Sequence, residues 1–184
     1  MWTKSATWEN GTVPAAGDRV VVRSGDHVIY DADCKDVIHL VQVAGTLEFA
    51  NDRNTRLEVG LLTVVPSEMP TEDGFDCHAD PHAADNHRSG HATKPRPSLL
   101  IGRPEAPIPG KHTALIRLHY VEGMNKETCP AIVSCGGRME LHGEPMRLTW
   151  TKLKKKAAIG ATELTLMDSV ADWKAGDHLV VTRT

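Results

Sequence analysis

Histidines gather in one short stretch of this 184-residue sequence, together with carboxylates and a thiol. Imidazole, carboxylate and thiolate groups are the usual protein ligands of Zn²⁺, Ni²⁺ and Cu²⁺. The histidines form two i, i+4 pairs, and each pair shares a face if the segment turns helical. A solvated polar loop that holds no physiological metal is the alternative interpretation. The candidate ligands are His78, His82, His87 and His91, with Asp76, Cys77, Asp80 and Asp85 beside them.

Paired carboxylates are the second candidate, because glycosidases cleave sugar polymers with two carboxyl groups about 5–10 Å apart. Four glutamates come into consideration: Glu105, Glu122, Glu140 and Glu144. Glu140 lies between Met139 and Leu141 on an expected strand, so its side chain points outward to solvent. We therefore assign no catalytic residue to this chain.

The four cysteines lack the paired close spacings of a zinc site and can form disulfides in three pairings. Cys129 and Cys135 flank a short segment and close a small disulfide loop if the compartment oxidises. Cys34 and Cys77 then remain to pair. The alternative is a set of inert thiols, since no cysteine lies in a recognisable activating setting.

Exposed tryptophans stack on sugars, and the chain has four: Trp2, Trp8, Trp150 and Trp173. We expect Trp150 and Trp173 to pack in the interior, which is the usual fate of tryptophan. Trp2 and Trp8 belong to a loop-like N-terminal segment that we expect to cover an open end of the fold.

A short basic run contains Lys152, Lys154, Lys155 and Lys156. Such a run attracts an anionic polysaccharide such as hyaluronan, or it is a solvated turn. The whole chain carries 21 Lys and Arg against 24 Asp and Glu, a net charge of −3, which excludes a basic nucleic-acid-binding protein. No apolar run approaches the length of a membrane span, and the first residues lack the order of a signal peptide.

The elements that must position these groups are strands. Val, Ile, Leu and Thr runs of four to eight residues alternate with turns in a chain that has 15 Gly and 11 Pro, and helix signals are nearly absent. A Gly-x-Leu-x-apolar unit or a close variant recurs at 45–49, 60–64 and 137–141. Sandwiches and barrels share this spacing, but a glycine that opens a strand favours the tight corner of a stacked β-solenoid. Residues 66–97 have no period and read as an insertion.

Four segments taken in order resemble the G-eight (G8) domain, which is named for its glycines: residues 8–22, 43–49, 100–107 and 136–143. This family includes fibrocystin, the cell-surface and cell-migration-inducing hyaluronidases, and bacterial secreted proteins. Residues 148–153 and 170–181 resemble the first coils of the right-handed parallel β-helix that follows the domain in the hyaluronidase-type proteins. The resemblance assigns structural roles to Gly11, Gly17, Gly25, Gly45, Gly60, Gly102, Gly136 or Gly137, and Gly143.

The resemblance implies an all-β, irregular many-stranded domain over residues 1–147, with the His-rich insertion at 66–97, leading into β-helix strands at 148–184. It implies a non-catalytic extracellular or cell-surface module that caps a β-helix and contributes to polysaccharide binding. Further C-terminal β-helix coils are the expected intramolecular partner. One alternative is the N-terminal part of a hyaluronidase-type enzyme, with Ca²⁺ as a cofactor. The other is a metal-binding module, with Zn²⁺ held by the histidine loop.

Overall fold

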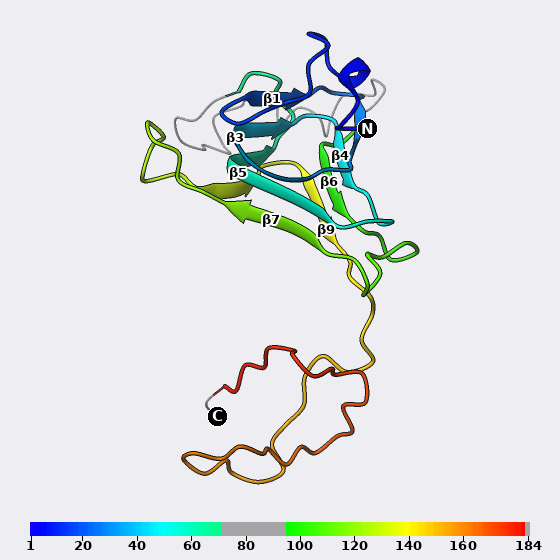
Figure 1. Cartoon of the computed structure of the whole chain (residues 1–184), viewed down its shortest axis with the longest axis vertical. Coiled ribbons are helices and arrows are strands. Elements are labelled where there is room, and N and C mark those ends of the chain that lie inside the picture. Colours follow the sequence, from blue (N-terminus) through cyan, green and yellow to red (C-terminus); the bar gives the residue numbers. More distant parts are fainter. Residues whose placement is uncertain (71–94, 183–184) are drawn as a thin grey trace, which may run out of the picture. The chain divides into compact units, whose positions relative to one another are not determined.

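The computed structural model describes residues 1–70 and 95–182 of the chain. It contains two compact units, Met1–Glu144 and Pro145–Thr184, which we treat separately (Figure 1). The candidate metal ligands His78, His82, His87 and His91 lie outside the described residues, as does Cys77.

The first unit is built from two sheets whose strand pairings are all parallel. One sheet contains β1 (Arg19–Val22), β3 (Asp33–Val43), β5 (Thr55–Val64), β7 (Ala114–Leu118) and β8 (Ala131–Ser134). The other contains β2 (His27–Tyr30), β4 (Thr46–Phe49), β6 (Ser98–Ile101) and β9 (Arg138–Leu141). A short 3₁₀ helix, η1 (Ser5–Thr7), precedes them, and the described residues contain no α-helix.

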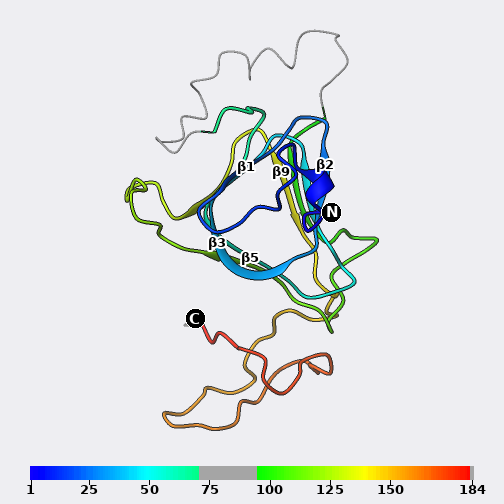
Figure 2. The same cartoon turned by 45° about the horizontal axis from the view of Figure 1, so that its top comes forward.

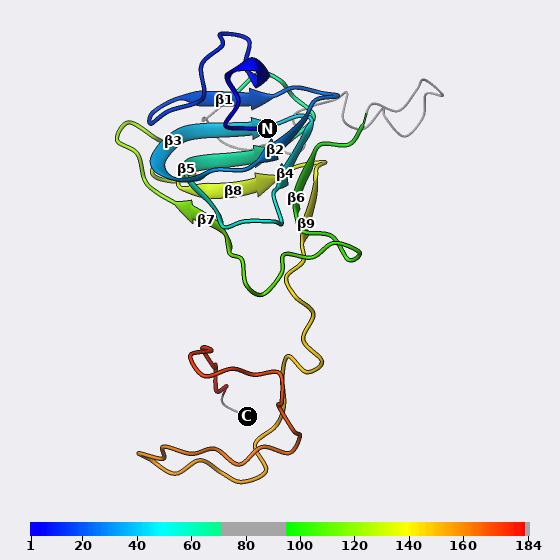
Figure 3. The same cartoon turned by 45° about the vertical axis from the view of Figure 1, so that its right-hand side comes forward.

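The chain alternates between the sheets, so each coil adds one layer to both (Figures 1 and 3). β1 and β2 form the first coil, β3 and β4 the second, and β5 and β6 the third. In the fourth coil the first sheet is interrupted: β7 pairs with the first half of β5 and β8 with its second half, and β9 completes the coil. The unit is therefore a short parallel β-solenoid, which confirms the all-β prediction.

The core lies between the two sheets (Figure 2) and is filled by the inward side chains of each strand. β1 and β2 show the two-residue alternation of strands that are buried on one face. β5 is buried on both faces, because residues 119–130 cover its outer side. Met124 and Cys129 from this covering segment pack on Leu40 and Leu61 as a second apolar cluster.

Glycine opens two strands where the solenoid turns between sheets. A Cβ atom on Gly45, before β4, would lie 2.1 Å from the carbonyl oxygen of Arg23 in the preceding coil. One on Gly137, before β9, would lie 2.5 Å from the carbonyl oxygen of Val64. Gly60 lies inside β5 instead, where a Cβ atom would meet the His39 carbonyl oxygen at 2.7 Å. All three positions require close approach of neighbouring backbone, but only Gly45 and Gly137 open strands.

The second unit contains no strand within its described residues, 145–182. An isolated antiparallel bridge joins Leu153 to Leu166, and the indole Nε1 of Trp173 donates a hydrogen bond to the Leu148 carbonyl oxygen at 2.8 Å. Trp150 does not pack as expected, since 67% of it is exposed. The β-helix strands expected over residues 148–184 therefore stay a prediction.

Candidate functional site

The first end of the solenoid is closed by an aromatic stack. Trp2 packs edge-on against both Trp8 and Tyr30, with ring centroids 4.9 Å apart in each pair, and Tyr30 packs on Phe49 at the same spacing. Tyr30 and Phe49 are register partners on β2 and β4, so Trp2 continues their column beyond β2, the first strand of its sheet. Only 3% of Trp2 is exposed, and the N-terminal segment therefore acts as a lid on the first coil.

Backbone and side-chain hydrogen bonds fix this lid. The Trp2 amide donates to the Ile29 carbonyl oxygen at 2.7 Å, and the Trp8 indole donates to the Trp2 carbonyl oxygen at 2.8 Å. The amide and hydroxyl of Thr3 donate to the two carboxylate oxygens of Asp31 at 3.0 and 2.7 Å. Burial acts to raise the pKa of Asp31, but these bonds outweigh it and hold the pKa below its usual value. The prediction that Trp2 and Trp8 cover an end of the fold agrees with this packing.

The last coil of the same unit is not covered in this way. The register that pairs β4 with β6, continued by one residue, brings Phe49 opposite Ile101, and Ile101 pairs with Leu141 on β9. The column thus runs from Trp2 to Leu141. Ile101 is 8% exposed, whereas Leu141 is 63% exposed. Among the described residues of this unit, no further layer of side chains covers the inward side chains of the last coil.

A cavity of about 380 Å³ opens at this end of the unit, and its apolar lining includes Ile101, Ile108 and Leu141. Among the described residues, β7 and β8 pair only with β5, and β9 pairs only with β6. Each therefore presents a free edge and an incompletely covered apolar face. This combination is suited to receive another coil that stacks in the same register.

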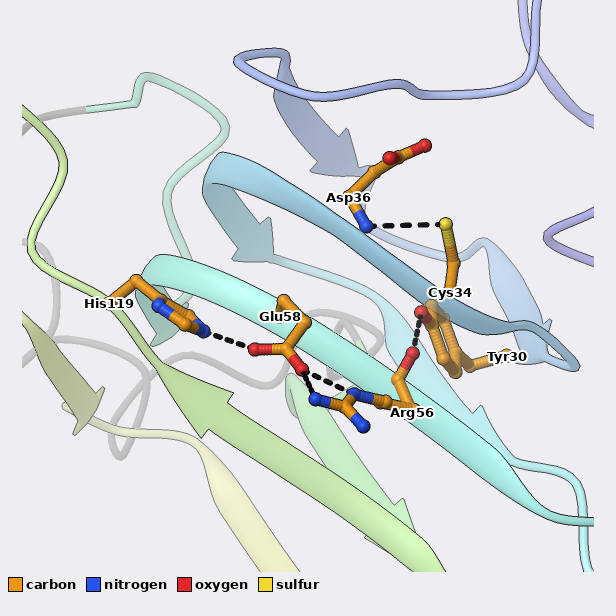
Figure 4. A network of polar contacts seen from close by, with 6 residues as sticks. All are labelled: Tyr30, Cys34, Asp36, Arg56, Glu58 and His119. Carbon is orange, nitrogen blue, oxygen red and sulfur yellow. Dashed lines mark hydrogen bonds and ion pairs between the residues drawn. The ribbon is translucent and has the colours of Figure 1, made fainter.

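A buried carboxylate lies on the outer face of the first sheet (Figure 4). Glu58 of β5 is 2% exposed, and its two oxygens accept hydrogen bonds from Arg56 and from Nε2 of His119. His119 follows β7, and its amide donates to the Val59 carbonyl oxygen at 3.0 Å. The Glu58 cluster, which we define as Arg56, Glu58 and His119, thus fastens the start of the covering segment to the sheet.

The charges of this cluster are matched. Burial acts to raise the pKa of Glu58, but hydrogen bonds and charge attraction from His119 and Arg56 outweigh it and leave the pKa below its usual value. Tyr30 adds a link on the core side, because its hydroxyl donates to the Arg56 carbonyl oxygen at 2.7 Å. Burial raises the pKa of Tyr30 well above its usual value. The cluster joins β5 to the start of the covering segment through side-chain and backbone hydrogen bonds, so the arrangement fits a structural clamp.

None of the candidate sites predicted from the sequence included the Glu58 cluster, although the sequence contains one signal for it. Glu58 is the single charged residue inside the largely apolar run 57–65. Buried carboxylates are rare unless they are paired, so such a residue predicts partners on neighbouring strands.

The glutamates considered for glycoside cleavage lie on one strand and in three exposed turns or bends. Glu140 lies on the outer face of β9, as predicted, but only 22% of its side chain is exposed, and it ion-pairs with Arg138 on its own strand. Glu48 of β4 lies on the same sheet face and accepts hydrogen bonds from His27 at 2.7 Å and Arg103 at 2.8 Å. β6 separates their strands. Glu105, Glu122 and Glu144 lie in exposed turns or bends.

The predicted Cys129–Cys135 disulfide is wrong. Cys129 has a free thiol and is buried against Leu40 and Leu61, whereas Cys135 is disulfide-bonded. The apolar packing of Cys129 in the second cluster explains why it does not form the small loop. Cys34 also has a free thiol, so the accompanying Cys34–Cys77 pairing is not formed.

Metal-ligand clusters and membrane-spanning helices are both missing from the described part of the chain. Among residues 1–70 and 95–182, no group of three or more His, Cys, Asp or Glu side chains is arranged to hold a metal ion. No helix within the same ranges is long and apolar enough to cross a membrane.

The parallel sheets define the first unit as a short β-solenoid, and Trp2 and Trp8 cover one of its ends. Residues 7–154 match the model of the G8 domain, so the chain belongs to the G8 domain family. This confirms the resemblance proposed from the glycine-bearing segments.

Fibrocystin-L and fibrocystin are relatives of this chain. Mouse fibrocystin-L is 24% identical over 184 residues, and human fibrocystin-L is 25% identical over 183; each match covers 100% of this chain. Mouse fibrocystin is 24% identical over 197 residues, with 98% of this chain covered. The chain spans only 4% of the length of each of these relatives. No solved structure matches the chain.

Proposed function

We propose that this G8 domain is a non-catalytic module that closes the N-terminal end of a longer parallel β-solenoid. The contrast between the two ends of its core supports this role. At one end Trp2 and Trp8 cover the first coil. At the other end Leu141 is exposed, and the outer edges of β7, β8 and β9 have no strand partner among the described residues of the unit. A solenoid needs one cap at each end, and an uncovered end accepts the next coil.

The extracellular or cell-surface location is part of this proposal and is supported by the similarity to fibrocystin and fibrocystin-L. A contribution to polysaccharide binding is likewise proposed for the module.

Self-association of the intact chain tests the open end. Free strand edges beside exposed apolar side chains pair with another copy, so sedimentation velocity should show concentration-dependent association. Leu141→Lys places a charge on the open end and should return the chain to monomer. Ser5→Lys adds the same charge on the lidded end, where Ser5 is exposed, and should leave association unchanged. A wild-type chain that stays monomeric at all concentrations would argue against the open end.

The two alternatives have separate tests. A hyaluronidase-type enzyme must shorten polysaccharide chains, so a size-resolved digest of hyaluronan and other polysaccharides, with and without Ca²⁺, should show intact polymers if the proposal is right. A metal-binding module must contain stoichiometric metal, which elemental analysis of untagged protein detects. Shortened polymers would replace the capping proposal with the enzyme, and stoichiometric metal would add a site to it.

A further inference from the structure

The basic run of the second unit begins on one arm of a hairpin-like turn whose two arms are joined by a single isolated bridge. The Lys154 amide donates to the Thr165 carbonyl oxygen at 2.8 Å, and the Met167 amide donates to the Lys152 carbonyl oxygen at 2.9 Å. The Leu153–Leu166 bridge lies between these two bonds. We call residues 152–167 the lysine ribbon. Its hydrogen bonds fix the two arms, and the residues between them form the tip.

The ribbon separates its apolar and basic side chains. Leu153 and Leu166 face each other across the bridge and are partly covered. Lys152 and Lys154, which alternate with Leu153 along the chain, are exposed. Lys155 and Lys156 continue the exposed run into the tip, where Gly160 takes a positive φ of 77° in a turn. Four ammonium groups therefore lie on one short projecting element.

These charges are not neutralised locally. Residues 152–163 contain four lysines and one acidic residue, Glu163, so 4 − 1 gives a net charge of +3 in a chain whose overall charge is −3. Within the described part of the chain, no carboxylate forms an ion pair with any of the four lysines. A concentrated positive charge on an acidic protein attracts an anionic partner to this position and to few others.

The spacing selects a densely charged partner. The Cα atoms of Lys154 and Lys156 are at most about 7 Å apart along the chain. Four lysines within residues 152–156 are paired most completely by a polymer that offers several closely spaced anions. A polysaccharide with one carboxylate for every two sugars offers too few, whereas a heavily sulfated one offers several. The lysine ammonium is a point charge on a flexible side chain, so it can pair with anionic groups without the fixed planar geometry by which arginine binds them.

We infer that the lysine ribbon is a binding site for densely sulfated polysaccharide. This inference concerns the second unit alone and does not rest on the capping proposal. The acidic overall charge of the chain disfavours nucleic acid as the partner. The ligand makes ion pairs with Lys152, Lys154, Lys155 and Lys156, and affinity falls as salt screens them.

Dextran sulfate and uncharged dextran provide matched probes, because they share a backbone and differ only in sulfate. Binding of the intact chain to each polymer is measured by titration at low ionic strength. The triple variant Lys154→Gln, Lys155→Gln, Lys156→Gln should bind dextran sulfate about tenfold or more weakly. The control variant Lys4→Gln, Lys35→Gln, Lys111→Gln changes three other exposed lysines. Both variants have a net charge of −3 − 3 = −6, and the control should stay within about twofold of wild type.

The binding measurements distinguish a specific site from a general effect of charge. Binding to dextran sulfate, none to dextran, and loss only in the ribbon variant supports the site, provided that circular dichroism shows both variants folded. Equal losses in the two variants would mean a general charge effect and overturn it. Unchanged binding by the ribbon variant would also overturn it. Tighter binding to phosphatidylserine vesicles, duplex DNA or hyaluronan than to dextran sulfate would replace the proposed ligand by another.

Discussion

Trp2 and Leu141 lie at opposite ends of one column of inward side chains, yet 3% of Trp2 is exposed against 63% of Leu141. The three residues between them, Tyr30, Phe49 and Ile101, are all buried. Within the described part of the first unit, the column is therefore covered at its Trp2 end and uncovered at its Leu141 end. This difference in exposure between the two ends is the main support for the proposed capping role.

Removal of the Trp2 side chain should lower the free energy of unfolding substantially. Trp2→Ala empties a buried site that contacts Trp8 and Tyr30, and we expect a loss of about 3–5 kcal/mol in the free energy of unfolding. Trp150→Ala is the matched control, because Trp150 is largely exposed and its loss should cost about 0.5 kcal/mol or less. Urea unfolding followed by circular dichroism measures both. Equal costs for the two variants would contradict the lid.

Gly45 should not tolerate a side chain. Gly45→Ala drives a Cβ atom into the carbonyl oxygens of Arg23 and Asp26, and we expect a loss of about 3 kcal/mol or more in the free energy of unfolding. Gly143→Ala is the control, since a Cβ atom there would have no neighbour within 4 Å and the φ of Gly143 is not positive. Thermal unfolding of both variants tests the stacked corner, which a stable Gly45→Ala would refute.

The Glu58 cluster predicts a pH dependence. Glu58→Gln leaves Arg56 and His119 without their buried counter-charge and should cost about 2 kcal/mol at pH 7. The pKa of folded Glu58 lies below the ordinary value of 4.5, so its contribution is complete above about pH 4.5 and is lost as the pH falls through the folded pKa. Urea unfolding at a series of pH values should show the difference between wild type and variant shrinking below pH 4.5. Glu105→Gln, at an exposed turn, should show no such trend.

The free thiols should differ in reactivity. Cys129 is buried in the second apolar cluster, whereas Cys34 is partly exposed. Alkylation of the folded, unreduced chain should therefore modify Cys34 first, and Cys129 only after denaturation. Mass spectrometry of peptides from the labelled protein identifies both sites. A Cys129–Cys135 crosslink in the same digest would contradict the structure.

Local patterns predicted much of the fold. The alternation in β1 and β2 and the strand-opening Gly45 and Gly137 indicated short strands with tight corners, and both features depend on neighbouring residues in the chain. Gly60 lies inside β5 and does not open a strand as the motif indicates, and its neighbours there, His39 and Met124, come from distant parts of the chain.

The functional contacts were harder to predict because they join distant residues. His119 reaches Glu58 across 61 positions, and Arg103 reaches Glu48 across 55. Register between coils sets these pairs, and a single sequence does not reveal register. The wrong Cys129–Cys135 pairing had the same origin, since closeness in sequence was used in place of the packing that buries Cys129.

Hydrogen exchange in the intact chain tests the capping account most directly. β2 and β9 are the terminal strands of the same sheet, and each has one strand neighbour among the described residues. Only β2 has Trp2 above it, with the Trp2 amide bonded to Ile29. The account predicts that the amides of residues 27–30 exchange more slowly than those of residues 138–141. Equal or greater protection of β9 would contradict the open end and with it the proposed continuation of the solenoid.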